Sequence, residues 1–286
     1  MAGEPAQALS ELFRVDGRVA LVTGGAGLLG RRYCEALLEA GGRVVIADLD
    51  GDRAEGLAAE LSASDALGLT LDVSDEASVQ AAVERSVDRF GRLDILVNNA
   101  ALTVRGGSER LRPEDYFAPF ERYPRAVWDL ALSVNLTGMM LCAQAAGRQM
   151  LAQGGGVMVN IASTYGVVAP DQRLYEGVAS PYGSSDSTAG FNTPVSYAVT
   201  KTAVLGLTRY LATYWGRQNI RVNALTPHGV YDNHDETFVR NFAYRSPLGR
   251  MARNDEYRGA LLFLVSDASS YMTGANLIVD GGWTAW

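Results

Sequence analysis

Short apolar runs alternate with longer amphipathic stretches along most of the chain. Runs rich in Val, Ile and Leu predict buried strands, and the stretches between them predict helices. This alternation is typical of βαβ units, in which helices cover both faces of a parallel sheet. The predicted strands are Arg18–Val22, Arg43–Ala47, Ala66–Leu71, Leu93–Val97, Val157–Ile161, Arg221–Leu225 and Asn276–Val279.

Capping signals delimit the predicted helices between these strands. One helix stops at Gly41-Gly42. Another is preceded by Ser74 as its predicted N-terminal cap, begins at Asp75-Glu76 and stops at Gly91. No internal repeat or linker divides the chain, so we predict a single α/β domain, 1–286, with a doubly wound parallel sheet. The clearest helices are Gly30–Ala40, Asp75–Phe90, Pro124–Ala152 and Pro194–Gln218.

Two inserted segments depart from the alternation, Thr103–Tyr123 and Pro170–Thr193. Loops of this length without regular structure are uncommon in compact domains unless they are lids or binding loops. Both follow predicted strands at their carboxyl ends, where open α/β sheets bind ligands. The second insert is expected to be either a wall of the substrate pocket or an oligomer contact. A third segment, 231–253, is expected to be a substrate loop region.

Composition and charge exclude several classes of protein. Acidic residues number 32 and basic residues 25, so the formal net charge is −7, which argues against nucleic-acid binding. Cys34 and Cys142 both lie in helix-like stretches and imply no disulfide framework. The sequence shows no signal-peptide pattern and no apolar run of ~20 residues, so a cytoplasmic protein is expected. His228 and His234 lack the spacing of metal ligands, so no metal is expected.

A glycine-rich turn, Thr23-Gly24-Gly25-Ala26-Gly27-Leu28-Leu29-Gly30, joins the first strand to the first helix. Such a turn lets backbone N–H groups approach a pyrophosphate, and the helix N-terminus adds positive potential. Asp48 ends the second strand, where its carboxylate can accept hydrogen bonds from the adenosine ribose and would repel a ribose phosphate. The sequence therefore predicts NAD rather than NADP. Arg31 and Arg32 could soften this preference or simply be solvated.

Polar residues at four further positions indicate a nucleotide site and a reaction site. Asp72 ends the third strand and could meet the adenine amino group or cap the next helix. Tyr197 and Lys201 lie four positions apart on a predicted helix and so share one face. An ammonium and a positive nicotinamide ring would lower the tyrosine pKa from about 10 toward neutrality, which suits a general acid or base. Ser163 follows a strand and could polarise a substrate carbonyl.

Taken in order, these motifs resemble the short-chain dehydrogenase/reductase family over roughly residues 13–286. The resemblance implies a Rossmann sheet with NAD(H) at its carboxyl edge and hydride transfer at nicotinamide C4. The residues that carry it are the Thr23–Gly30 turn, Asp72, Asn98-Asn99-Ala100-Ala101, Asn135, Ser163, Tyr197, Lys201, Arg221-Val222-Asn223-Ala224, Pro227 and Val279-Asp280-Gly281-Gly282-Trp283.

The resemblance also implies roles for single residues. Tyr197 would be the acid/base, Ser163 would orient the carbonyl or alcohol, and Lys201 would bind the nicotinamide ribose and lower the tyrosine pKa. Asn135 would hold a water of a proton relay, or it would be a packing residue. Asn98 belongs to a segment that would close over the adenosine ribose and brace the sheet. The expected cofactor contacts are Thr23, Gly24, Gly27, Leu28, Leu29, Gly30, Asp48, Asp72, Val73, Asn99, Ala100, Ala101, Tyr197, Lys201, Pro227, Gly229 and Val230.

Three positions depart from the compact branch of the family. Its turn usually reads Thr-Gly-x-x-x-Gly-x-Gly, whereas here Leu28 replaces a glycine, as in the extended branch of nucleotide-sugar epimerases and dehydratases. The chain length and the Val-Asp-Gly-Gly ending favour the compact branch. His228 stands where glycine is usual, and Asp232 stands where threonine is usual.

The polar character of the inserts predicts the kind of substrate. Arg173 and Tyr175 suit a hydroxyl-rich or anionic molecule. His228 could contact the substrate or be a structural residue. We therefore expect an NAD-dependent oxidoreductase acting on a secondary alcohol or carbonyl of a sugar, sugar acid or polyol. The alternatives are a nucleotide-sugar epimerase or dehydratase that uses transient oxidation, and a non-catalytic NAD-binding regulator. The regulator is disfavoured because the serine, tyrosine, lysine and asparagine are all retained.

Two of the predicted helices are long and apolar, Pro124–Ala152 and Pro194–Gln218. They carry more hydrophobic surface than one sheet face can bury, and such an excess marks an interface. A homo-oligomer is expected, and the family resemblance implies a tetramer.

Overall fold

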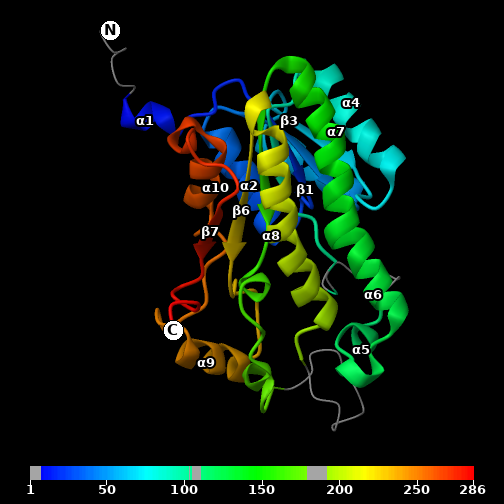
Figure 1. The fold of residues 1–286 in the computed structure, drawn as a ribbon, viewed down its shortest axis with the longest axis vertical. Helices are drawn as coiled ribbons and strands as arrows, with labels where there is room; N and C mark the ends of the chain where they lie inside the picture. The colour runs from blue at the N-terminus through cyan, green and yellow to red at the C-terminus, as the bar shows by residue number, and fades with distance from the viewer. Residues whose placement is uncertain (1–7, 103, 105–110, 179–191) are drawn as a thin grey trace.

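Seven parallel strands form one sheet in the order β3-β2-β1-β4-β5-β6-β7 (Figure 1). The computed structural model describes residues 8–102, 104, 111–178 and 192–286. The order reverses between β1 and β4, which is the switch point where open sheets of this kind bind ligands. The strands are β1 Val19–Thr23, β2 Arg43–Asp48, β3 Ala66–Thr70, β4 Ile95–Asn98, β5 Gly156–Ile161, β6 Ile220–Pro227 and β7 Asn276–Val279.

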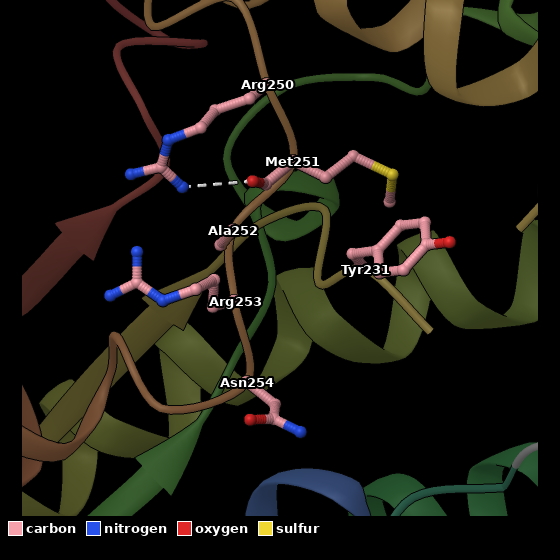
Figure 2. Close-up of a pocket in the computed structure, with 6 residues that line it drawn as sticks. All are labelled: Tyr231, Arg250, Met251, Ala252, Arg253 and Asn254. Atoms are coloured by element: carbon pink, nitrogen blue, oxygen red, sulfur yellow. Dashed lines mark hydrogen bonds between the residues drawn. The ribbon is translucent and has the colours of Figure 1, made fainter. Parts of the chain in front are cut away.

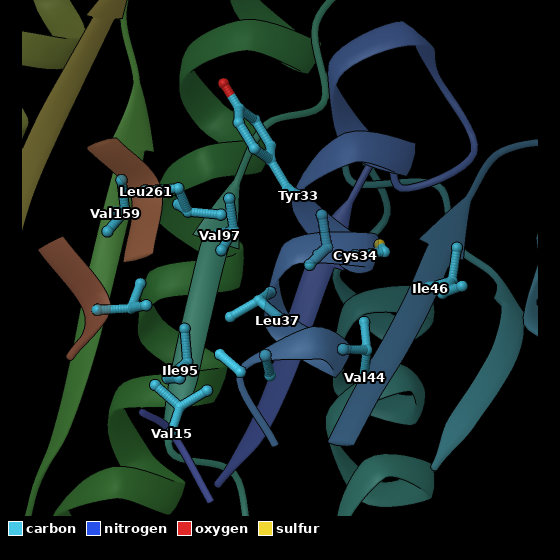
Figure 3. Packing of buried hydrophobic residues seen from close by; sticks show 14 of the residues in the cluster. Val15, Tyr33, Cys34, Leu37, Val44, Ile46, Ile95, Val97, Val159 and Leu261 are labelled. Atoms are coloured by element: carbon cyan, nitrogen blue, oxygen red, sulfur yellow. The ribbon is translucent and has the colours of Figure 1, made fainter. Parts of the chain in front are cut away.

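The strand sequences alternate between the two faces of this sheet, as a period of two requires. In β1, Ala20 and Val22 pack with α2, α3 and α10, whereas Val19 and Leu21 pack with α4, α7 and α8. Figure 3 shows the first of these layers, in which Leu37 of α2 and Leu261 of α10 meet the strands. The helices are α1 Leu9–Leu12, α2 Leu28–Glu39, α3 Gly51–Leu61, α4 Glu76–Phe90, α5 Pro113–Tyr116, α6 Arg125–Leu132, α7 Gly138–Gln153, α8 Val195–Trp215, α9 Glu236–Arg245 and α10 Arg258–Val265.

The predicted single-domain α/β fold and its seven strands are confirmed, with strand ends displaced by at most two residues. The predicted end of a helix at Gly91 is confirmed, whereas the N-cap of that helix is Asp75 and not the predicted Ser74. Asp75 caps α4 by accepting a hydrogen bond from the Ala77 amide, and Gly91 ends α4 in the left-handed conformation. The sequence did not predict α9, although Asp235 caps it by accepting hydrogen bonds from the amides of Thr237 and Phe238.

The predicted helix Pro124–Ala152 is not one α-helix. A five-residue π-helix, η3 Ser133–Thr137, separates α6 from α7. Segments of this kind occur mostly as single-turn bulges at functional sites, and this one carries the buried Asn135. The inserts also contain short helices that the sequence did not predict. They are α5, the 3-10 turn Phe120–Arg122 and the 3-10 turn η5 Gln172–Tyr175.

Candidate active site

The glycine-rich turn folds tightly against the end of β4. Gly24 has a positive φ of 61°, and a Cβ atom there would lie 2.9 Å from the Ala100 Cα. A Cβ atom on Gly30 would lie only 2.1 Å from the Gly24 carbonyl oxygen. Gly27 is the N-cap of α2 and has no side chain with which to cap it. The first amides of the helix are thus left for an external anion, which fits the pyrophosphate of a dinucleotide.

Two side chains lock this turn to β4. The Thr23 hydroxyl accepts hydrogen bonds from the amides of Asn99 and Ala100, both at 3.0 Å. The Asn99 side chain donates to the carbonyls of Thr23 (2.9 Å) and Gly24 (3.0 Å). Thr23 and Asn99, both predicted cofactor contacts, therefore fix the shape of the glycine-rich turn. Asn98 braces the sheet, because its amide donates to the Asn160 side chain of β5 at 2.9 Å.

Asp48 lies beside the turn at the end of β2. Its Oδ2 accepts a hydrogen bond from the Ala26 amide at 3.0 Å, so the carboxylate is held next to the predicted ribose position. Arg53 of α3 donates to the Ala26 carbonyl at 2.9 Å, which places a cation nearby that sequence reasoning missed. Its position in the first turn of the helix after Asp48 could have revealed it.

The two arginines of α2 are paired rather than free to receive a phosphate. Arg31 and Arg32 both bind Glu35, at 3.0 and 2.8 Å. Arg31 also pairs with Glu60, and Arg32 donates to Asn254 at 3.2 Å. The alternative that both arginines are simply solvated is therefore incomplete, because each forms an ion pair or a hydrogen bond with a specific side chain.

Asp72 and Val73 follow β3 toward the same edge. Asp72 Oδ1 accepts hydrogen bonds from the Ser74 amide (2.9 Å) and hydroxyl (2.6 Å). Because Asp75 is the cap of α4, the capping alternative for Asp72 is wrong. Val73 is buried against Gly138, where a Cβ atom would lie 2.8 Å from the valine side chain.

Ser163, Tyr197 and Lys201 lie close together in the structure. Ser163 begins a 3-10 turn, η4 Thr164–Gly166, and forms a hydrogen bond with the Tyr197 hydroxyl. Lys201 lies one turn along α8 from Tyr197, with Nζ 5.8 Å from the tyrosine ring centre. Its ammonium is 2% exposed and donates to the Ile161 carbonyl at 2.7 Å. It is also the only lysine in the chain.

Asn135 is connected to this cluster through its side chain. Its Oδ1 accepts a hydrogen bond from the Leu102 amide at 2.7 Å, and its Nδ2 donates to the Thr200 hydroxyl at 3.1 Å. Thr200 directly precedes Lys201 on α8. The Asn135 side-chain amide thus connects η3, the segment after β4 and α8 to one another.

The electrostatics of the cluster correct one expectation. Burial raises the pKa of Tyr197 above its ordinary value, and the hydrogen bond with Ser163 opposes this only in part. Burial also lowers the pKa of Lys201 to about 8. The expected lowering of the tyrosine pKa by Lys201 is not found in the protein alone, because the ammonium is directed at the Ile161 carbonyl. A lowering would have to come from a positively charged ligand.

His228 sits in an aromatic cage that the sequence did not predict. We define the cage as Tyr165, Phe242 and Trp283, whose ring centres lie 5.4, 5.0 and 4.4 Å from the imidazole. His228 is 7% exposed, and its Nε2 has no hydrogen-bond partner among the described residues. Burial lowers its pKa to about 4. The imidazole is therefore neutral at physiological pH.

The last turn of the chain positions the Trp283 wall of this cage. Asp280 accepts hydrogen bonds from the amides of Gly282 and Thr284, both at 2.9 Å, and from the Thr284 hydroxyl at 2.7 Å. These hydrogen bonds of Asp280 hold the Val-Asp-Gly-Gly ending in a turn that places Trp283 against His228. Phe238 and Phe242 are spaced four apart on α9, a spacing that could have revealed one wall of the cage.

The described part of the second insert approaches the cluster through Tyr175. Its hydroxyl shares a hydrogen bond with Thr193 at 3.0 Å, and its ionisation is coupled to that of Tyr197. Arg173 is different, because its guanidinium binds Asp171 at 2.9 Å and its side chain is 68% exposed. Of these two predicted substrate residues, the structure thus places Tyr175 nearer the Tyr197 hydroxyl. Residues 179–191 of this insert, like 105–110 of the first, lie outside the described residues.

The segment that follows Pro227 is paired on one edge. The Ala252 amide donates to the Gly229 carbonyl at 2.9 Å, and the Tyr231 amide donates to the Ala252 carbonyl at 2.8 Å. The amide and carbonyl of Val230 therefore face the opposite edge, as alternation along an extended chain requires. Gly229 has a positive φ of 49°, and a Cβ atom there would collide with Phe242. Glycine is therefore required at 229 by the contact with Phe242, whereas the backbone polar groups of Val230 face away from Ala252.

A cavity of about 400 Å³ lies beside this segment, and Figure 2 shows the residues around it. The lining contains none of the catalytic candidates. Among the described residues, no group of three or more His, Cys, Asp or Glu side chains could hold a metal ion. The cavity is lined by Tyr231, Arg250, Met251, Ala252, Arg253 and Asn254.

Known proteins resemble this chain over nearly its whole length. Residues 18–185 match the family described as short chain dehydrogenase, and residues 178–284 match that described as Enoyl-(Acyl carrier protein) reductase. D-threitol dehydrogenase of Mycolicibacterium smegmatis is 36% identical over 282 residues, 95% of each chain. NAD-dependent glycerol dehydrogenase of Listeria innocua is 32% identical, over 95% of this chain and 96% of the relative. The crystal structure of a gluconate 5-dehydrogenase from Burkholderia cenocepacia with NADP and tartrate is 32% identical, with a TM-score of 0.82, and covers 98% of this chain and 100% of that one.

Proposed function

The chain belongs to the short-chain dehydrogenase/reductase family, and we propose that it is an NAD-dependent dehydrogenase of a small polyol, sugar or sugar acid. Oxidoreductase chemistry on CH–OH groups follows from the family and from its relatives. The observation that carries the finer proposal is the joint placement of Ser163, Tyr197 and Lys201. Tyr165 and Tyr175 lie near the Tyr197 hydroxyl, and Tyr165 contacts the His228 imidazole. Hydroxyl and imidazole groups of this kind suit a hydroxyl-rich substrate better than an apolar one.

In the proposed mechanism, side chains of the protein accept the proton of the substrate hydroxyl. A bound nicotinamide would supply the hydride acceptor. The Tyr197 hydroxyl, ionised, would take the proton of the substrate hydroxyl, while the Ser163 hydroxyl orients the substrate oxygen. The positive charge of the bound nicotinamide ring would favour the ionised tyrosine, and the Lys201 ammonium would hold the cofactor ribose. Asn135 would position the helix on which both residues lie, because it binds Thr200.

The proposal of NAD over NADP rests on Asp48. Its carboxylate would be hydrogen-bonded by ribose hydroxyls and would repel a phosphate on the same ribose. The names of the relatives point both ways, since the Listeria enzyme is called NAD-dependent and the Burkholderia structure holds NADP. The pairing of Arg31 and Arg32 with acidic side chains supports NAD, whereas Arg53 is the cation best placed to favour NADP.

Titration of both dinucleotides tests this proposal. The wild type should bind NAD about tenfold or more tightly than NADP, a difference of about 1.4 kcal/mol. Asp48→Ala should remove most of that preference. Asp52→Ala removes an exposed carboxylate from the first turn of α3 and serves as the matched control, with no effect on the preference. Equal or tighter binding of NADP by the wild type would contradict the proposal.

A screen with NAD against polyols, aldoses and sugar acids tests the substrate class. Steady NADH production with a free polyol or sugar is the expected result. A nucleotide-sugar epimerase would instead turn over its substrate with no net change in NADH. Loss of the signal in Tyr197→Phe would show that the measured activity belongs to this site. A protein that binds NAD and oxidises none of these classes would favour the regulator alternative.

We further propose that the chain forms a homo-oligomer, a tetramer by its family. Tyr210 and Tyr214 stack on the outer side of α8 with ring centres 5.9 Å apart, and both are mostly exposed. By length and composition the helical run Arg125–Gln153 could cross a membrane, but its inner side packs in the core through Cys142 and Met150. Less than half of its most apolar stretch is buried in one chain, which supports an interface there.

A further inference from the structure

Two buried tyrosines lie between the glycine-turn helix and the segment after β6. Tyr257 precedes α10, is 1% exposed, and donates its hydroxyl to the His228 carbonyl at 2.5 Å. The same hydroxyl accepts from the His228 amide at 3.2 Å. Tyr33 of α2 is fully buried in the same core cluster, and Figure 3 shows its hydroxyl at the upper end of that cluster. Among the described residues, the Tyr33 hydroxyl has no partner.

The Tyr257 hydroxyl fixes one end of a short rigid segment. It holds both backbone polar groups of His228, and the Gly229 carbonyl and the Tyr231 amide are held by the backbone of Ala252. The side chain of His228 is fixed independently by the aromatic cage. The backbone polar groups that face Tyr257 and Ala252 therefore all have a hydrogen-bond partner, and the amide and carbonyl of Val230 point to the opposite edge of the segment.

We propose that Tyr257 is a positioning residue that sets the Val230 backbone for the carboxamide of the nicotinamide ring. This inference rests on the proposed dinucleotide function. A carboxamide has one donor and one acceptor group, and an adjacent backbone amide and carbonyl match it. Because burial raises the pKa of Tyr257 to about 12, its hydroxyl remains a donor throughout the working pH range.

Tyr33 provides a matched control for the alternative, in which Tyr257 only fills the core. Both residues are buried tyrosines of one cluster, so replacement by phenylalanine removes a single oxygen in each case. Only the Tyr257 hydroxyl holds the backbone of the proposed cofactor segment. Its loss leaves two buried backbone groups without a partner, which is costly, whereas loss of the unpartnered Tyr33 hydroxyl is not.

The experiment compares NAD with ADP-ribose, which lacks the nicotinamide ring, by calorimetric titration of the intact protein. Tyr257→Phe should weaken NAD binding about tenfold or more and leave ADP-ribose binding within twofold of the wild type. Its KM for NAD should rise more than its kcat falls. Tyr33→Phe should bind both ligands like the wild type. Unchanged NAD affinity in Tyr257→Phe, or an equal loss of ADP-ribose affinity, would overturn the inference. If the wild type bound neither ligand, the proposed function itself would fail.

Hydrogen exchange of the wild type gives a second test that needs no variant. The amides of His228 and Tyr231 should exchange slowly without any ligand, because Tyr257 and Ala252 accept their hydrogen bonds. Exchange as fast as that of a solvated loop would overturn the inference, whether or not Tyr257→Phe folds.

Discussion

Removing the caged imidazole should change the acid stability of the protein. We consider His228→Phe, which keeps a planar ring between Phe242 and Trp283 but cannot bind a proton. The pKa of His228 is about 4 in the folded protein, against about 6.5 for an unperturbed histidine in the unfolded chain. Burial is the main cause, and the nearby Asp280 carboxylate opposes it.

The direction of the effect follows from proton binding. Between pH 6.5 and 4 the unfolded chain binds more protons at this residue than the folded chain does, so stability falls as the pH falls through that window. Below pH 4 the full penalty is present, and above pH 6.5 it is absent. At pH 4.5 the loss amounts to about 2.5 kcal/mol, at about 1.4 kcal/mol per unit of pKa difference.

Urea unfolding at pH 7.5 and pH 4.5 measures this term. The wild type should lose about 2.5 kcal/mol more than His228→Phe between the two pH values, because all other titrating groups are common to both proteins. His234→Gln replaces the other histidine of the chain and should keep the contribution of the caged imidazole. If the wild type and His228→Phe lose stability in parallel, within about 0.5 kcal/mol, the imidazole is protonated in the folded protein and the reasoning fails.

Three further predictions concern the glycine turn, the chemistry and the assembly. Gly30→Ala should destabilise the protein by about 1–3 kcal/mol and abolish dinucleotide binding, because its Cβ atom would lie 2.1 Å from the Gly24 carbonyl oxygen. Gly56→Ala, at an open helical position of α3, should instead stabilise by about 0.5–1 kcal/mol, and equal effects of the two substitutions in thermal unfolding would contradict the packing argument. Tyr197→Phe should bind NAD like the wild type while turnover falls about 10²–10⁴-fold, and a variant that retains a tenth of the wild-type rate would exclude the acid/base role. Sedimentation at micromolar concentration should show an oligomer, and a monomer would refute the proposed interface on α7 and α8.

Local patterns predicted the parts of the fold that local chemistry determines. Strands such as Val157–Ile161 are recognisable because a central parallel strand is apolar on both faces. Gly91 was recognisable as the end of α4, and the start of α4 was recognisable to within one residue, because capping involves only neighbouring residues. The π-helix at Asn135 was not predictable in this way. Its side-chain partners, Leu102 and Thr200, lie 33 and 65 positions away, so the break depends on tertiary contacts.

The candidate site, too, was predictable where local sequence determines it and not where tertiary contacts do. The spacing of Tyr197 and Lys201 placed both on one helix face, but the spacing could not reveal their surroundings. The lysine turned out to be directed at the Ile161 carbonyl, and burial dominated the pKa of the tyrosine. The cage around His228 draws its walls from η4, α9 and the final turn of the chain. No single stretch of sequence contains that arrangement, and only the unusual histidine indicated it.

Because its one lysine is buried, the protein has a surface almost without reactive amines. The other 24 basic side chains are arginines, whose guanidinium groups stay charged and do not react with ordinary acylating reagents. Apart from an α-amino group, the only amine lies buried at Lys201. Amine-directed cross-linkers or immobilisation resins should therefore find almost nothing on the surface. Any slow incorporation of an amine label at Lys201 would report the opening of the active site and should be suppressed by a bound dinucleotide.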